Sequence, residues 1–257
     1  MNKLRMSIIG TIETCPYLAK QLYGEKGKEK GYVESKQNFY AWNGSLLHDL
    51  FDKYFKEGMT IEQMHEEYDK EIANMTLEFP DGKRDYFIKT SHEQIDYFAD
   101  KLSLSTPIAT EIKFDDLYID GFDMPWSGTI DRIEGNLEEG YLELQDYKTG
   151  SHTKYTKQEL SNNVQAYVYY HACIKMYGIA PTSFTFIFPR DKRSKTIVYT
   201  NEYLKRAKSR IKRSINDIEQ GLFLPEGRKG DFFCKKFCEL YSECPKFEKK
   251  KGWGLCL

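Results

Sequence analysis

Residues 127–150 read SGTIDRIEGNLEEGYLELQDYKTG, and this stretch decides how the chain is expected to fold. Its alternation of apolar and polar residues predicts two neighbouring strands, with Asp131 on the first and Asp146 and Lys148 on the second. Successive side chains of a strand point to opposite faces, so Asp146 and Lys148 share one face. Glu143, three residues before Asp146, should point to the other face. The stretch therefore predicts two carboxylates and an amine at one end of a small sheet.

Two aspartates on neighbouring strands can hold a divalent metal ion without enclosing it. Mg²⁺ prefers hard oxygen ligands and keeps several waters, and a metal held in this way can assist hydrolysis of a phosphodiester. Asp131 and Asp146 would bind the metal, and the backbone carbonyl of Tyr147 would offer a further ligand. Lys148 would contact the attacking water or the scissile phosphate. Taken alone, an Asp-x-Lys triplet is more often ordinary surface charge near a strand end.

Helical patterns precede this stretch. Residues 40–56 place leucine and aromatic side chains on one face, and His48 lies beside that face. Thr60 and Ser91 are candidate N-caps of two further helices, which would form an insert over about residues 60–104. Cys15 should lie at or just before a helix start, because proline is tolerated in a first helical turn and Pro16 follows it.

The central strands belong to a longer pattern. A first strand is expected to begin near Glu111, and this strand completes a three-stranded meander with residues 127–150. For the Glu111 side chain itself we expect a surface role. Residues 157–178 predict one continuous helix that ends at Gly178. Residues 182–188 and 196–199 predict a second pair of strands, followed by a basic helix over residues 201–220. The pattern predicts an α/β fold with a small mixed sheet flanked by helices.

Composition places the chain among globular proteins, with 40% hydrophobic and 15% aromatic residues. Its apolar runs are too short to span a bilayer and its N-terminus lacks a signal-peptide pattern, so we expect a cytoplasmic protein without membrane contact. The net charge of −1 hides an uneven distribution, since residues 190–213 hold ten Lys or Arg residues. A basic surface near an acidic pocket suits a nucleic acid together with a metal ion.

The runs GTIDRIEG and LQDYKTG resemble the core of the PD-(D/E)XK nuclease superfamily, in particular its RecB-like branch. The same branch has a helix-borne histidine before the sheet, matched by His48 in GSLLHDLF, and a Gln-x-x-x-Tyr signature, matched by Gln165 and Tyr169. The resemblance implies a restriction-endonuclease-like fold and a catalytic set of Lys148, Asp131, Asp146, Gln165 and Tyr169. It also implies a Mg²⁺ or Mn²⁺ site formed by His48, Asp131, Asp146 and the carbonyl of Tyr147. Without it, His48, Gln165 and Tyr169 could simply pack in the core.

The cysteines resemble a second feature of that branch. AddB-type nucleases and a CRISPR spacer-acquisition nuclease family bind an iron–sulfur cluster through one cysteine before the core and three after it. Cys15, Cys234, Cys238 and Cys244 show the same split, and four thiolates complete a [4Fe–4S] site. Four thiolates also suit Zn²⁺, so zinc remains an alternative.

The resemblance implies one nuclease domain over residues 1–257, with a cysteine-rich C-terminal lobe of about residues 225–257 joined to Cys15. Its expected activity is metal-dependent hydrolysis of DNA, as an exonuclease on single strands or ends. A non-catalytic DNA-binding or assembly subunit of the same fold, stabilised by an iron–sulfur cluster or zinc, is the alternative. No GxxxxGK[ST] phosphate loop occurs. We therefore expect a nuclease that acts alone or beside a separate helicase, recombination or CRISPR partner, in a bacterial, archaeal or phage setting. The oligomeric state stays open.

Overall fold

The computed structural model describes residues 3–23, 38–102, 104–238 and 240–247. The chain divides into two compact units, one of residues 36–117 and 128–207, and one of residues 1–35, 118–127 and 208–257. We call them the sheet unit and the terminal unit. The single domain expected over residues 1–257 stays a prediction. Among the described helices, none has the length and apolar character needed to cross a membrane.

A five-stranded mixed sheet organises the sheet unit, as the sequence pattern predicts. The strands lie in the order β1-β2-β3-β4-β5, with β3 and β4 parallel and the β2–β3 and β4–β5 pairs antiparallel. Their bounds are Ala109–Leu117 for β1, Trp126–Asn136 for β2, Tyr141–Tyr147 for β3, Ser183–Phe188 for β4 and Arg193–Val198 for β5. The stretch with Asp131, Asp146 and Lys148 therefore occupies the middle of the sheet.

The crossover from β3 to β4 contains two helices, where the sequence pattern predicts one. α7 spans Lys157–Leu160 and α8 spans Val164–Tyr177. The break occurs because Asn163 acts as an N-cap, its side-chain oxygen accepting a hydrogen bond from the amide of Ala166 at 3.0 Å. The predicted end of the helix is confirmed, since Gly178 takes a left-handed conformation with φ of 70°.

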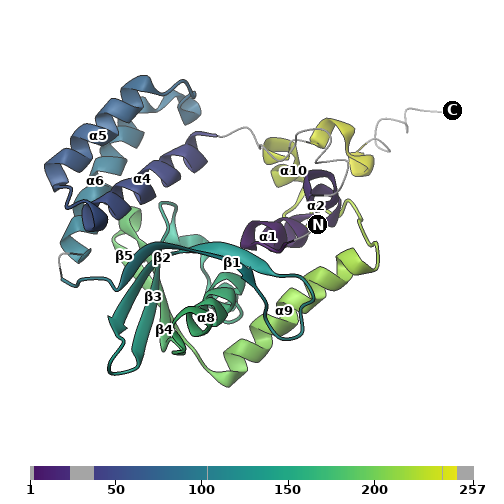
Figure 1. The fold of residues 1–257 in the computed structure, drawn as a ribbon. Helices are drawn as coiled ribbons and strands as arrows, with labels where there is room; N and C mark the ends of the chain where they lie inside the picture. The colour runs from purple at the N-terminus through teal and green to yellow at the C-terminus, as the bar shows by residue number, and fades with distance from the viewer. Residues whose placement is uncertain (1–2, 24–37, 103, 239, 248–257) are drawn as a thin grey trace. The chain divides into compact units, whose positions relative to one another are not determined.

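Three helices of the sheet unit lie side by side (Figure 1). They are α4 at Phe39–Lys56, α5 at Ile61–Asn74 and α6 at Arg84–Leu102. Thr60 caps α5 through a capping box with Gln63, as expected. The N-cap prediction for Ser91 is wrong, because α6 already begins at Arg84. Ser91 is instead buried within that helix, where its hydroxyl accepts a hydrogen bond from the Asn43 side chain at 3.2 Å.

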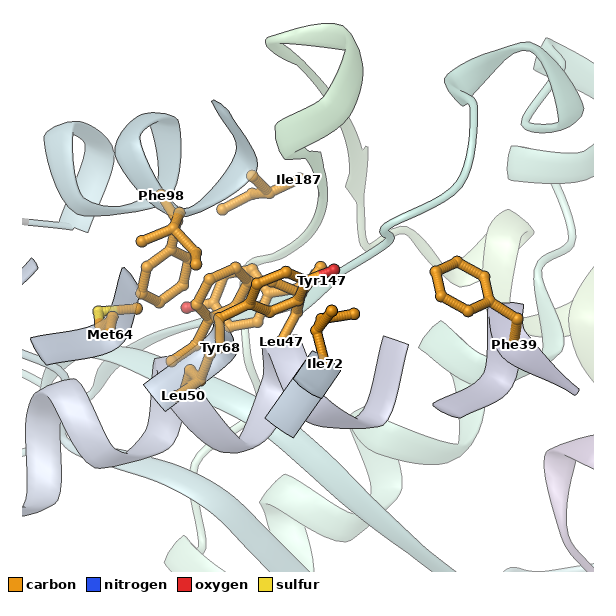
Figure 2. Packing of buried hydrophobic residues seen from close by; sticks show 11 residues of the cluster. Phe39, Leu47, Leu50, Met64, Tyr68, Ile72, Phe98, Tyr147 and Ile187 are labelled. Atoms are coloured by element: carbon orange, nitrogen blue, oxygen red, sulfur yellow. The ribbon is translucent and has the colours of Figure 1, made fainter. Parts of the chain in front are cut away.

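These three helices share a buried core with the sheet (Figure 2). The ring of Phe98 on α6 lies against Phe51 on α4 and against Tyr147 at the end of β3. Tyr147 points toward the helices, so its neighbour Asp146 points to the opposite face of the sheet. That opposite face contacts α8, where Tyr169 lies against Phe184 of β4. The end of β3 thus has a helical layer on each side.

The terminal unit joins segments from both ends of the chain. It contains α1 at Met6–Thr14, α2 at Pro16–Tyr23, most of α9 at Asn201–Glu219, and α10 at Asp231–Phe237. Arg210 contacts both carboxylate oxygens of Glu13 at 2.7 Å. The amide of Arg228 donates to the carbonyl of Thr14 at 3.0 Å. Four short 3₁₀ helices also occur in the described residues: Tyr241–Glu243 in the terminal unit, and Pro80–Gly82, His152–Lys154 and Pro189–Asp191 in the sheet unit.

Candidate active site and metal centre

Asp146 and Lys148 form an ion pair at the end of β3. Nζ of Lys148 lies 2.5 Å from Oδ2 of Asp146, and Asp146 is buried. The backbone of Lys148 is held by β4, because its amide donates to the carbonyl of Ile187 at 2.8 Å. Burial opposes the charge on Lys148, but the Asp146 carboxylate outweighs this effect and raises the pKa of Lys148 above its ordinary value. Lys148 is therefore a positively charged group at neutral pH.

Asp131 of β2 is buried beside the same strand end. Its Oδ2 accepts a hydrogen bond from the amide of Tyr147 at 2.8 Å, which orients the carboxylate. Burial and the neighbouring Asp146 carboxylate raise the pKa of Asp131 to about 7. Two buried carboxylates that disfavour each other's charge attract a cation strongly.

His48 reaches this cluster from α4. Its Nε2 lies 2.9 Å from the carbonyl oxygen of Tyr147, and its Nδ1 lies 3.5 Å from Oδ2 of Asp131. Burial disfavours a charged ring, but the Asp131, Glu111 and Asp146 carboxylates outweigh it and raise the pKa of His48 to about 9. One turn earlier, a Cβ on Gly44 would lie 3.3 Å from Oγ1 of Thr149, so glycine lets α4 approach the residues that follow β3.

Glu111 of β1 belongs to the same cluster, although the sequence pattern gave it a surface role. Its Oε1 lies 3.5 Å from Nδ1 of His48. The backbone of Glu111 has φ of 46°, an uncommon value for a residue with a side chain, so regular alternation along β1 is interrupted at this residue. An alternating pattern assigns faces by counting residues in twos and therefore misses such a residue.

The donor atoms of His48, Glu111 and Asp131 all lie within 4.8 Å of one another. One imidazole nitrogen and two carboxylates, next to the Tyr147 carbonyl, form a donor set that fits Mg²⁺ or Mn²⁺. An open cleft of about 720 Å³ leads to His48 and Glu111, and the side chains of Tyr40, Lys56 and Lys113 line it. A metal ion and an extended substrate could therefore reach this cluster from solvent.

Gln165 and Tyr169 lie one turn apart on α8, behind the ion pair. Nε2 of Gln165 donates to Oδ1 of Asp146 at 2.5 Å and to the hydroxyl of Tyr169 at 3.1 Å. The Tyr169 hydroxyl in turn donates to the carbonyl of Thr129 on β2. The resemblance places this pair in the catalytic set, and its described contacts are with Asp146 and the sheet. In this arrangement Gln165 holds Asp146 in place.

Four cysteines line one small cavity in the terminal unit: Cys15, Cys234, Cys238 and Cys244. Cys15 lies between α1 and α2, as expected from Pro16. A Cβ on Gly227 would lie 2.6 Å from Sγ of Cys234, so this backbone passes very close to the sulfur. Cys173 is buried in α8 of the sheet unit, whereas Cys256 lies outside the described residues. Four thiols around one cavity fit a cluster or a zinc ion.

The mixed sheet with Asp146 and Lys148 at the end of its middle strand defines an α/β protein with a restriction-endonuclease-like core. Residues 4–245 match the family model of the PD-(D/E)XK nuclease superfamily, and the chain belongs to this superfamily. Membership supports a hydrolase that acts on nucleic acid.

The fold also resembles a crystal structure of a proposed exonuclease from Eubacterium rectale. The TM-score is 0.52 and the sequence identity 14%, and the alignment covers 85% of this chain and 80% of the other. At this identity the similarity shows a shared fold. A comparison with curated proteins gives no match.

Proposed function

We propose that the chain is a DNA nuclease of the RecB-like branch that depends on Mg²⁺ or Mn²⁺. The observation that carries the proposal is the meeting of the His48, Glu111 and Asp131 donor atoms beside the Asp146–Lys148 ion pair. The membership of the superfamily and the hydrogen bond from Gln165 to Asp146 support it.

Each side chain of the site has its own role in the proposed reaction. His48, Glu111, Asp131 and the Tyr147 carbonyl would hold the metal, with Asp146 beside them. A divalent ion bound there supplies a Lewis acid for the phosphoryl oxygens and lowers the pKa of water. Lys148, held charged by Asp146, would orient the attacking water and offset negative charge that develops on the phosphate. Gln165 keeps Asp146 in position for both tasks.

The cleft suits a single strand or a DNA end. Tyr40 is 59% exposed and lines the cleft, where its ring can stack on a base that is not paired. Lys56 and Lys113 of the same cleft supply positive charge for phosphates. The exonuclease description of the Eubacterium rectale protein agrees with this substrate class. We therefore propose exonuclease action on single strands or ends.

A cleavage assay tests the function. End-labelled single- and double-stranded DNA, linear and circular, is incubated with Mg²⁺, Mn²⁺ or a chelator. We expect metal-dependent degradation of linear DNA and a loss of roughly 10²–10³-fold in rate for Lys148→Ala and Asp146→Asn. Asp85→Asn and Lys89→Ala are matched controls, because Asp85 is 98% exposed and Lys89 is 79% exposed. Equal rates in all variants would overturn the proposal. DNA binding without cleavage by the wild type would favour the non-catalytic subunit.

For the terminal unit we propose a [4Fe–4S] cluster held by Cys15, Cys234, Cys238 and Cys244. The four side chains line one cavity although they come from opposite ends of the chain. Burial raises the pKa of the Cys238 thiol, so a positively charged centre is needed to stabilise its thiolate. The cluster would join the segment after α1 to the segment around α10. Zinc is the competing occupant.

A further inference from the structure

Two histidines of the helical insert face each other. His65 of α5 and His92 of α6 have ring centroids 4.6 Å apart, with the ring planes inclined by 35°. Their Nδ1 atoms lie within hydrogen-bond distance of each other. The side chains are 26% and 25% exposed, so solvent reaches both rings.

An aspartate of the opposite helix binds the outer nitrogen of each ring. Nε2 of His65 lies 2.8 Å from Oδ1 of Asp96, and Nε2 of His92 lies 2.9 Å from Oδ1 of Asp69. Each helix thus contributes a His-x-x-x-Asp pair, whose members lie one turn apart on one helix face. Because the early residues of α5 meet later residues of α6, the two helices run antiparallel and the four side chains form a nearly two-fold arrangement.

The carboxylates decide where the ring protons lie. An ionised aspartate can only accept a hydrogen bond, so each Nε2 carries a proton. A neutral imidazole has one such proton, which leaves a lone pair on Nδ1 of both His65 and His92. Two lone pairs that face each other at hydrogen-bond distance repel unless a positive centre lies between them. The arrangement therefore requires a proton or a metal ion at this point.

We propose that His65 and His92 bind a divalent transition-metal ion of the Zn²⁺ or Ni²⁺ type through their Nδ1 atoms. Imidazole nitrogens suit Zn²⁺, Ni²⁺ and Cu²⁺, whereas Mg²⁺ prefers oxygen ligands. A metal-bound histidine almost always donates its other ring N–H to a carboxylate or carbonyl, and Asp69 and Asp96 stand in that position. Water, or a group from outside the chain, completes the coordination at the exposed side.

This ion would join the two helices of the insert. α5 and α6 connect through the segment around Pro80–Gly82, and the histidine pair lies away from that connection, with His65 near the start of α5 and His92 near the middle of α6. Tyr68 links the pair to the core, since its ring packs against His92 and its hydroxyl donates to Asn43 of α4 at 2.7 Å. Metal binding therefore stabilises the helical layer that covers the end of β3.

Titration of the full chain with Ni²⁺ tests the site. We compare the wild type with the double variant His65→Gln/His92→Gln and with the matched control Glu66→Gln/Glu93→Gln, whose parent side chains are exposed on the same helices. We expect the wild type and the control to bind one Ni²⁺ ion more per chain than the histidine variant. Ni²⁺ should also raise their unfolding temperature and not that of the histidine variant.

A second variant keeps the test decisive if the double variant folds poorly. Asp69→Asn leaves both ligands in place and should weaken Ni²⁺ binding by about 10–100-fold through the orientation of His92. The proposal is overturned if wild type and histidine variant bind the same number of ions. It is equally overturned if Asp69→Asn binds Ni²⁺ like the wild type. In the first case the two rings share only a proton, and in the second Asp69 does not orient His92 as a metal ligand.

Discussion

The carbonyl oxygen of Tyr147 lies 2.9 Å from Nε2 of His48 on α4, while the ring of Tyr147 is buried against α4 and its neighbouring helices α5 and α6. One residue thus contributes to the candidate metal site through its backbone and to the core through its side chain. The ring of His48 also meets the Tyr147 ring edge to face, with centroids 5.9 Å apart. Packing of the helical layer and geometry of the site are therefore linked at this residue.

Metal binding should strengthen as pH rises. The pKa of His48 is raised to about 9, so its ring holds a proton at pH 7 that a metal ion must displace. Raising the pH toward 9 removes this competition, and the apparent Mn²⁺ affinity should rise by up to about tenfold per pH unit. Calorimetry in buffers of different ionisation enthalpy should show proton release. The slope should be smaller in His48→Asn, and a pH-independent affinity of the wild type would contradict this account.

Gln165→Leu should weaken the binding of the metal ion rather than the stability of the fold. The substitution removes the donor to Oδ1 of Asp146, which then loses its orientation. The Mn²⁺ concentration for half-maximal cleavage should rise by about 10–100-fold, and saturating Mn²⁺ should restore much of the rate. Gln158→Leu on α7 is the control, because that side chain is exposed. A loss of rate that excess Mn²⁺ does not restore would instead point to direct contact with the substrate.

Phe98→Ala should destabilise the sheet unit by about 3–5 kcal/mol in urea unfolding. Phe98 is 1% exposed and stacks on Phe51 with centroids 3.4 Å apart. Leu104→Ala is the control, since Leu104 is 79% exposed and its truncation should change stability by less than about 0.5 kcal/mol. Similar stabilities for the two variants would show that the helical layer contributes little to the core.

Cys234→Ala should abolish the metal content of the terminal unit. If a [4Fe–4S] cluster is present, protein purified without oxygen is brown and contains iron and sulfide, and the variant is colourless. Cys173→Ala is the matched control, because burial in α8 raises the pKa of that thiol to about 12 and keeps it inert. Colourless wild-type protein with bound zinc would exclude the cluster and leave the four-cysteine site intact.

The fold followed from local patterns because its strands alternate and its helices are amphipathic. Local patterns predict the wrong element where a tertiary contact outweighs a local signal or where a cap lies inside an amphipathic run. Ser91 is a good N-cap residue by type, but its hydroxyl bonds with Asn43 and the residue lies inside α6. Asn163 interrupts a pattern that otherwise reads as one helix. Ser91 is recognised only when its partner Asn43 is known, whereas Asn163 caps α8 through a local bond to the amide of Ala166 and is a preferred N-cap residue by type.

Some residues of the candidate site could be predicted from the sequence and others could not. The structure brings His48, Asp131, Asp146 and Lys148 together, yet Glu111 required a backbone conformation that the sequence does not reveal. The His65–His92 pair was missed although a signal exists, since His-x-x-x-Asp occurs in both helices of the insert. Pairing the two motifs needs the antiparallel register of α5 and α6, which only the folded chain supplies.

The candidate metal site also has a consequence for synthesis of the chain on the ribosome. Its donor atoms come from α4, β1, β2 and β3, and His48 and Tyr147 are 99 residues apart. Contacts over such separations form only after long loops have closed, so they appear late in folding. The backbone beside Tyr147 is completed by Ile187 of β4, which is translated later still. We therefore expect a nascent chain not to cleave nucleic acid until the sheet is complete.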